Sequence, residues 1–352
     1  MNLLQKDNSN ILRGTAILSI MYHNFFHCGL GFSEENEMVY YQSRSNAFVD
    51  ALCLNPTNAL YELSSFIGWI GVPVFVFLSG YGLCKKYPPQ LPINAHLYFL
   101  HNYFKLFFLL LPVIIFFILF DIKDASWTNM FKRIFSLSML QNINYPQLRT
   151  NPEVYWYFSL TFQYYIIYLV FRNFFKPFSL LILSIFSILL LGFLGNSDWY
   201  DAMSIYRHCA TGWFPVFALG IWFATIDEEI SFHCNNLFFE MLILVFLLVC
   251  IVVMNLNYFL WLLVPVVSVL LFYYIGVIMI RLPLLSNIFM WLGRYSAFIF
   301  VCHPVARTLY LVIQNYLNNI ILGTLLYTCM TLFMSYYFEK FYLLIKRKCN
   351  YM

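Results

Sequence analysis

Mostly apolar stretches of about 20 residues recur along the whole chain and constrain its fold more than any other feature. A helix needs about 20 such residues to cross the hydrocarbon core of a bilayer. Ten stretches are candidates, and they run near 11–30, 62–84, 103–120, 153–172, 178–195, 211–226, 237–254, 258–280, 287–309 and 319–343. We therefore predict an all-α protein, a polytopic transmembrane helical bundle of about ten spans.

The composition excludes a soluble globular protein. Of the 352 residues, 62% are hydrophobic and only 10% are charged, whereas about 25% of a soluble chain is charged. The net charge of +4 is too small and too scattered for a surface that binds nucleic acid. The nine cysteines form no CxxC pair and have no metal-ligand spacing, so we expect no metal site.

The chain is predicted to form a single membrane domain over residues 1–352, with no appended soluble domain. Segment 127–142 is too polar to span a bilayer and is expected to form an interfacial or re-entrant helix. If the N-terminus is cytoplasmic, 13 of the 20 Lys and Arg residues lie on the inner side. An even number of spans also returns the C-terminus to the cytoplasm, so both termini are predicted to be cytoplasmic.

Ionisable residues inside the expected spans are the first candidates for function, because burying them in a membrane is costly. The first span carries Arg13 at its cytoplasmic end, with His23 and His27 deeper in the bilayer. A neutral imidazole can take a proton near physiological pH. Alternatively, such a histidine only forms a hydrogen bond with a neighbouring helix.

Two further segments carry candidates. Lys85 and Lys86 end the second span, where they either attract a phosphorylated cytoplasmic ligand or anchor the span by the positive-inside effect. His303, followed by Pro304, lies toward the outer half of the ninth span.

Five strings in order carry a resemblance to a known family. They are RGTAILSIMYH (13–23), GVPVFVFLSGY (71–81), WYFSL (156–160), GWFPVFALGIW (212–222) and LGRYSAFIFVCHP (292–304). With them, nearly the whole chain resembles the membrane acyltransferase 3 family, whose members are integral membrane O-acyltransferases that modify bacterial surface polysaccharides. The resemblance implies ten spans with both termini cytoplasmic, which agrees with the topology predicted from the spans and charges.

The resemblance also implies a reaction and a location. The chain would be an acyl-coenzyme A-dependent O-acyltransferase, usually an O-acetyltransferase, in a bacterial inner membrane. Its co-substrate would be acetyl-coenzyme A, and its acceptor a sugar hydroxyl of an exopolysaccharide, a lipopolysaccharide or a lipid-linked sugar. Coenzyme phosphates would dock near Arg13, Lys85 and Lys86. On the outer side His303, a second catalytic candidate, would position the acceptor together with Arg149, Glu153, Arg207 and His208. Arg149 and Glu153 are equally well explained as a solvated interfacial pair.

One departure concerns the catalytic histidine. In the family, the arginine and histidine of the first span usually lie eleven positions apart, whereas Arg13 and His23 are ten apart. At about 100° per residue this places them some 80° apart around the helix. We predict that His23, rather than the alternative His27, is the general base or the acyl-accepting nucleophile.

Two other classes of function remain open at this stage. Intramembrane Arg and His also serve transporters or flippases that perform no acyl transfer. Against that reading, the chain shows no internal repeat of spans, a feature of many secondary transporters. In the other class, the bundle donates acyl groups to a separate soluble enzyme.

Overall fold

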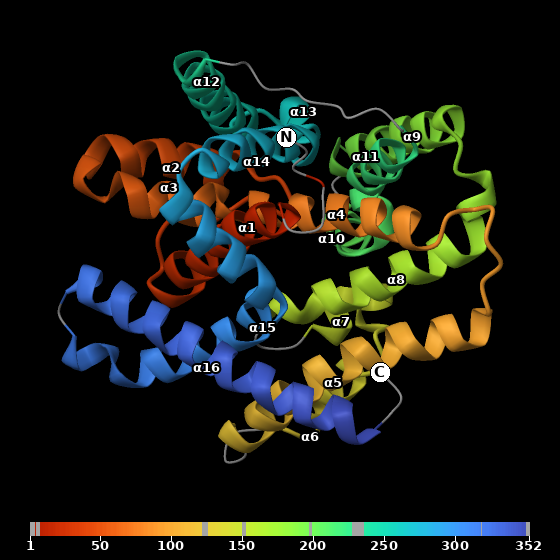
Figure 1. The fold of residues 1–352 in the computed structure, drawn as a ribbon. Coiled ribbons are helices and arrows are strands. Elements are labelled where there is room, and N and C mark those ends of the chain that lie inside the picture. Colours follow the sequence, from red (N-terminus) through yellow and green to blue (C-terminus); the bar gives the residue numbers. More distant parts are fainter. Residues whose placement is uncertain are drawn as a thin grey trace. The chain divides into compact units, whose positions relative to one another are not determined.

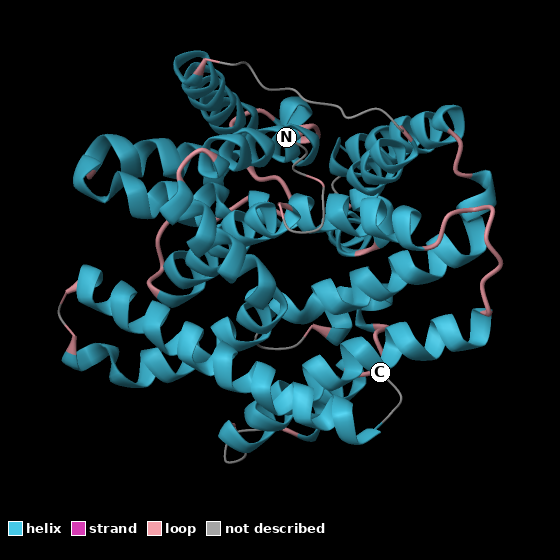
Figure 2. Ribbon diagram, in the orientation of Figure 1, coloured by secondary structure: helices cyan, strands magenta, loops and turns pink. Residues whose placement is uncertain are grey.

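The computed structural model describes residues 4, 8–121, 126–149, 153–196, 199–226, 236–317 and 319–349. Every regular element within this part of the chain is a helix (Figure 2). The predicted all-α class is therefore confirmed. The described chain divides into two compact units, while the prediction of a single acyltransferase domain stays a prediction.

The first unit lies within residues 1–88, 173–207 and 211–296 and holds the N-terminal helix α1 (Figure 1). Its helices are α1 (Ser9–Asn24), α2 (Gln42–Leu54), α3 (Ala59–Ile67), α4 (Gly71–Lys86), α9 (Pro177–Asn196), most of α10 (Tyr200–His208), α11 (Phe214–Thr225), α12 (Leu237–Asn255), α13 (Tyr258–Trp261), α14 (Val264–Ile280) and the first part of α15 (Pro283–Ile313).

The second unit lies within residues 89–172, 208–210 and 297–352. Its helices are α5 (Ala95–Phe120), α6 (Trp127–Ser136), α7 (Tyr145–Leu148), α8 (Trp156–Phe171), the remainder of α15 and α16 (Ile320–Cys349). The helix α6 occupies the segment that was expected to be interfacial or re-entrant. Its Arg133 is buried and donates hydrogen bonds to Asp121 and to the carbonyl oxygen of Phe117.

All ten expected spans fall on helical segments. Six helical stretches among the described residues are long and apolar enough to cross a membrane, namely Pro56–Lys86, Ala95–Phe120, Pro177–Gly195, Leu237–Asn255, Pro283–Tyr316 and Ile320–Arg347. The stretches Ala210–Thr225 and Val264–Ile280 are shorter apolar helices, and the remaining two expected spans coincide with the 16-residue helices α1 and α8. The polytopic membrane bundle is confirmed, whereas the count of ten and the orientation stay predictions.

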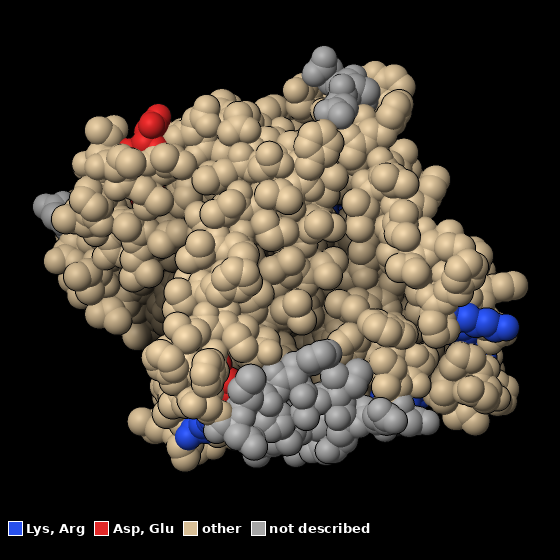
Figure 3. Space-filling view, turned by 90° about the horizontal axis from the view of Figure 1, so that it is seen from above, with Lys and Arg blue, Asp and Glu red and all other residues tan. Residues whose placement is uncertain are grey.

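Burial separates the helices that form a core from those that face lipid. The most apolar window of Leu237–Asn255 has a mean hydropathy of 3.1, yet only 17% of it is buried. By contrast, 78% of the corresponding window of Pro56–Lys86 is buried. Large apolar surfaces left exposed on long helices suit contact with hydrocarbon. Charged side chains are also sparse on the face drawn in Figure 3.

Glycines let the helices around α1 approach closely. A Cβ atom at Gly71 would lie 2.4 Å from the carbonyl oxygen of Ala16, and one at Gly68 would lie 2.6 Å from the Cβ of His23. The helices α4 and α11 are matched in the same way, because a Cβ at Gly80 would meet Phe217 and a Cβ at Gly220 would meet Phe77. Small residues at such crossings are typical of membrane helix packing, and here they fix the surroundings of His23.

Candidate active site

The first expected span ends in an irregular turn. The helix α1 continues directly into a π-helical turn, Phe25–Gly29, in which the backbone N–H of Leu30 donates to the carbonyl of Phe25 at 3.0 Å. The rings of His23 and His27 stack across this turn, with centroids 5.5 Å apart and planes inclined by 4°. The irregularity follows His23, so the α-helix is regular from Arg13 to His23 and the ten-position spacing stands.

His23 is buried in a fixed orientation. It is 4% exposed, and its Nδ1 lies 2.7 Å from the carbonyl oxygen of Ser65. Because a carbonyl can only accept a hydrogen bond, Nδ1 carries the proton in the neutral ring, and Nε2 presents its lone pair. The tautomer that a general base or a nucleophile requires is thus set by the backbone of α3.

The turn is followed by an acidic loop, Gly31–Tyr41, that folds back onto the histidines. Gly31 adopts a φ of +71°, a left-handed conformation that glycine tolerates without strain. The loop then places Oε2 of Glu35 3.0 Å from Nε2 of His27. Sequence reasoning missed this carboxylate, because nothing in SEENE distinguishes it from an ordinary hydrophilic connection.

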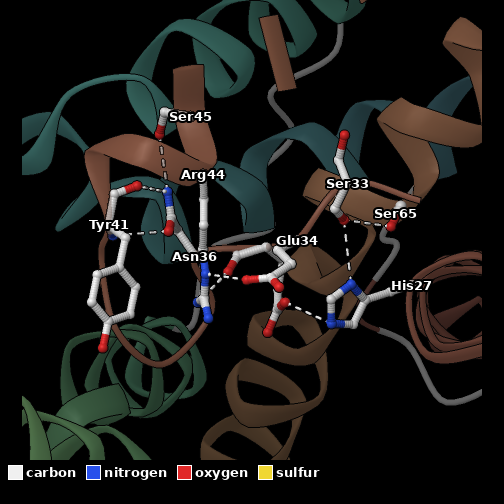
Figure 4. Close-up of polar contacts among 9 residues, drawn as sticks. His27, Ser33, Glu34, Asn36, Tyr41, Arg44, Ser45 and Ser65 are labelled. Carbon is white, nitrogen blue, oxygen red and sulfur yellow. Dashed lines mark hydrogen bonds and ion pairs between the residues drawn. The ribbon is translucent and has the colours of Figure 1, made fainter. Parts of the chain in front are cut away.

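His27 lies between two acceptors. Its Nδ1 is 3.3 Å from the carbonyl oxygen of Ser33, and its Nε2 faces the Glu35 carboxylate (Figure 4). Neither partner can donate a hydrogen bond, so both ring nitrogens of His27 carry protons. His27 is therefore a cation paired with Glu35, while His23 remains available as a base.

The conformation of the acidic loop is secured by hydrogen bonds at both ends (Figure 4). At one end, Ser33 donates from its backbone N–H and its hydroxyl to Oε2 of Glu62, at 2.9 and 2.5 Å, and its carbonyl accepts from the hydroxyl of Ser65 at 2.6 Å. At the other end, the fully buried Asn36 bonds the backbone N–H of Tyr41 and the hydroxyl of Ser45, each at 3.0 Å. These polar contacts therefore hold the acidic loop in one conformation.

Glu35 and Glu37 have opposite electrostatic environments. Burial acts to raise the pKa of Glu35, but the hydrogen bond to His27 and the charges of His27, His23 and Arg44 outweigh it and lower the pKa to about 2. Burial and the negative charge of Glu35 raise the pKa of Glu37 well above its usual value, and Arg207 only partly opposes them. Glu35 is thus a carboxylate, whereas the protonated acid is favoured at Glu37. A ring nitrogen of His23 and one oxygen of each glutamate lie within 4.8 Å of one another.

Arg207 binds the acidic loop at Glu37. It is 1% exposed, and its Nε donates to the carbonyl of Glu37 at 3.1 Å. Its guanidinium carbon lies 4.1, 5.0 and 5.9 Å from the ring centroids of three tryptophans, Trp213, Trp261 and Trp69 respectively. Desolvated cation–π contacts contribute about 2 kcal/mol each. These contacts give Arg207 a structural role, and its predicted role as an acceptor contact stays a prediction.

The residues expected to hold coenzyme phosphates all belong to the first unit. Arg13 donates to the side chain of Asn10 at 3.1 Å, and both Lys85 and Lys86 are exposed at the end of α4. The helices α1 and α4 run antiparallel, because Gly68 faces His23 while Gly71 faces Ala16. At 1.5 Å per residue, Lys85 lies about 21 Å along α4 from Gly71, the residue that faces Ala16. Their coenzyme-binding role stays a prediction.

The remaining predicted acceptor residues belong to the second unit. His303 is fully buried on α15, with Nδ1 3.2 Å from the carbonyl oxygen of Ile299. His208 is buried against the ring of Trp156 at a centroid distance of 5.4 Å. Arg149 is exposed at the end of α7, and the side chain of Glu153 lies outside the described residues. Their acceptor-side roles therefore stay predictions.

One buried charged residue of this unit, Arg307, was not among the candidates predicted from the sequence. Arg307 is only 7% exposed and follows His303 by four positions on the same helix. The i, i+4 spacing was the signal that could have identified it, since such residues share a helix face.

A comparison with protein families places the chain among membrane acyltransferases. The acyltransferase 3 family, described as an acyltransferase domain, matches residues 7–340. This chain, a multi-pass membrane acyltransferase, therefore belongs to the acyltransferase 3 family, and the resemblance drawn from its motifs is confirmed. No curated protein and no solved structure matches the chain.

Proposed function

We propose that this protein is an acyl-coenzyme A-dependent O-acyltransferase, with acetyl as the group transferred. The donor is cytoplasmic acetyl-coenzyme A, and the acceptor is a sugar hydroxyl of an exported or surface polysaccharide. The location that suits both substrates is a bacterial inner membrane. The observation that carries this proposal is His23, a buried base whose tautomer is fixed by the Ser65 carbonyl.

The chemistry follows from the free lone pair on Nε2. As the acceptor oxygen attacks the thioester carbonyl, Nε2 of His23 takes the hydroxyl proton, the carbon–sulfur bond breaks, and the coenzyme leaves as a thiol after protonation. The Glu35 carboxylate, within 4.8 Å of a ring nitrogen of His23, stabilises the imidazolium that forms. In the alternative covalent route, Nε2 attacks the thioester carbonyl and the coenzyme leaves as a thiolate; the acceptor hydroxyl then takes the acyl group, the nitrogen–acyl bond breaks, and the hydroxyl proton passes to the released thiolate or to water.

The test uses purified protein in nanodiscs with acetyl-coenzyme A and polysaccharide from a producing strain. Release of coenzyme thiol and acetylation of the glycan are measured together, which also separates acyl transfer from transport without chemistry. His23→Ala should lower the turnover number by at least about a hundredfold, because it removes the base or nucleophile. His27→Ala should retain measurable activity, since His27 acts through its neighbours.

An exposed histidine provides the matched control. His96, at the start of α5, should be replaceable by alanine without change in turnover. Thiol release that depends neither on His23 nor on the glycan would contradict the proposal. Loss of activity in His27→Ala alone would transfer the catalytic role to His27.

A further inference from the structure

Three side chains at the candidate active site bring possible metal-binding atoms close together. One ring nitrogen of His23 and one carboxylate oxygen each of Glu35 and Glu37 lie within 4.8 Å of one another. Since Nδ1 of His23 faces the Ser65 carbonyl, the nitrogen available to a metal is Nε2. Metal-binding histidines commonly donate their other N–H to a backbone carbonyl in this way, which fixes the ring for coordination.

Glu37 adds an independent indication of a ligand. Its Oε1 is buried and has no hydrogen-bond partner among the described residues. An unpaired buried carboxyl oxygen is costly, and a second carboxylate beside it, that of Glu35, increases the cost of ionisation. A divalent cation between the two glutamates would displace the proton of Glu37, satisfy its buried oxygen and neutralise both resulting carboxylates.

The dimensions suit a small transition-metal ion. Three atoms no more than 4.8 Å apart share a point within about 2.8 Å of each, and zinc binds nitrogen and oxygen at about 2.0–2.2 Å. Shifts of less than about 1 Å at each side chain therefore complete the site. Imidazole together with carboxylates suits zinc and its neighbours in the periodic table, whereas magnesium prefers oxygen ligands and retains its water.

We propose that His23, Glu35 and Glu37 bind a divalent transition-metal cation such as Zn²⁺, and that the bound cation blocks acyl transfer by occupying the Nε2 lone pair of His23. The acyl-transfer reaction itself requires no metal in this proposal. The binding site stands on the geometry of the three side chains. The block rests on the proposed function, because only a catalytic Nε2 makes its occupation inhibitory.

Binding is measured with Zn²⁺ alone, by calorimetry on the purified full-length protein in detergent and in the presence of a weak competing chelator. Wild-type protein should bind one Zn²⁺ per chain and should not bind Mg²⁺ at the same concentration. Glu37→Gln keeps the side-chain shape and should weaken binding by at least about tenfold, since even residues that only support ligands cost that much. Glu34→Gln is the matched control, because Glu34 is the neighbouring exposed glutamate, paired with Arg44.

X-ray absorption at the zinc edge tests the ligands without any variant. The spectrum of the wild-type complex should show nitrogen and oxygen at about 2.0–2.1 Å, and sulfur at about 2.3 Å would assign the metal to cysteine. Equal Zn²⁺ affinity in the wild type, Glu37→Gln and His23→Ala would also overturn the site.

Inhibition is tested separately by titrating Zn²⁺ into the acyl-transfer assay. Half-inhibition should require at least about ten times more Zn²⁺ in Glu37→Gln than in the wild type or in Glu34→Gln. A chelator should leave the metal-free rate unchanged. If Zn²⁺ binds at the three residues without slowing transfer, or if the chelator abolishes activity, the proposed block is wrong although the site stands. Absence of acyl transfer in the untreated wild type would instead contradict the proposed function.

Discussion

Replacing Glu35 with glutamine removes the carboxylate that pairs with His27 while keeping the size of the side chain. The contacts of Glu35 lower its pKa from its usual 4.5 to about 2, and each pKa unit corresponds to about 1.4 kcal/mol. The carboxylate form is thus favoured in the folded protein by about 3 kcal/mol. The side chain is 18% exposed, so solvent screening removes little of this. We expect Glu35→Gln to lower the free energy of unfolding by about 2–3 kcal/mol at pH 7.

The pH dependence gives the prediction its sign. A folded-state pKa below the unfolded one means that the stabilisation is fully present above about pH 4.5 and is lost as the pH falls toward 2. Unfolding in mixed micelles with an increasing fraction of a denaturing detergent measures both quantities. Between pH 5 and 3 the wild type should therefore lose more stability than Glu35→Gln, and the two proteins should approach equal stability only as the pH falls toward 2.

Glu34→Gln again supplies the control. Glu34 pairs with Arg44 at 2.9 Å, but its side chain is 67% exposed, and exposed ion pairs contribute at most about 1 kcal/mol. If Glu35→Gln and Glu34→Gln destabilise the protein equally, with identical pH profiles, the inferred His27–Glu35 ion pair is refuted.

Two further predictions concern the side of the membrane that is expected to be cytoplasmic. Arg13→Gln should raise the Michaelis constant for acyl-coenzyme A by about ten- to a hundredfold, because a charge-assisted hydrogen bond to phosphate contributes about 1.5–3 kcal/mol. An unchanged Michaelis constant in a folded variant would mean that Arg13 only anchors the helix. Cysteine-accessibility labelling should find the loop 85–95 inside and the loops 31–60 and 121–150 outside. Labelling of 85–95 from outside would exclude a coenzyme site at Lys85 and Lys86.

The spans were predictable because their signal is local. A helix such as Leu237–Asn255 is recognised from its own apolar residues, whatever surrounds it. His23 was identified by its position after Arg13 in a family motif. The π-helical turn was not predictable, because its residues, FFHCG, carry no mark that separates them from an α-helix.

The carboxylates beside His23 depended on contacts that are remote in sequence. Asn36 accepts a hydrogen bond from the indole N–H of Trp261, which lies 225 residues away, and Glu37 meets Arg207 across 170 residues. Residues 33–37 read alone are a polar loop that solvent could surround. Only the packing of helices that are distant in sequence buries this loop beside His23.

The π-helical turn after His23 has a consequence for how the chain tolerates changes of length. A turn closed from residue i to i+5 holds one residue more than an α-helical turn, and each helical residue rotates the chain by about 100°. Deleting one residue between Phe25 and Gly29 would allow regular winding but would swing the acidic loop about a quarter-turn away from the two imidazoles. The extra residue therefore sets the angle between the membrane helix, which holds His23, and the loop, which holds Glu35 and Glu37. Insertions and deletions in this short stretch would misalign the loop with the imidazoles, whereas equal changes in the connection between α4 and α5 would leave that angle intact.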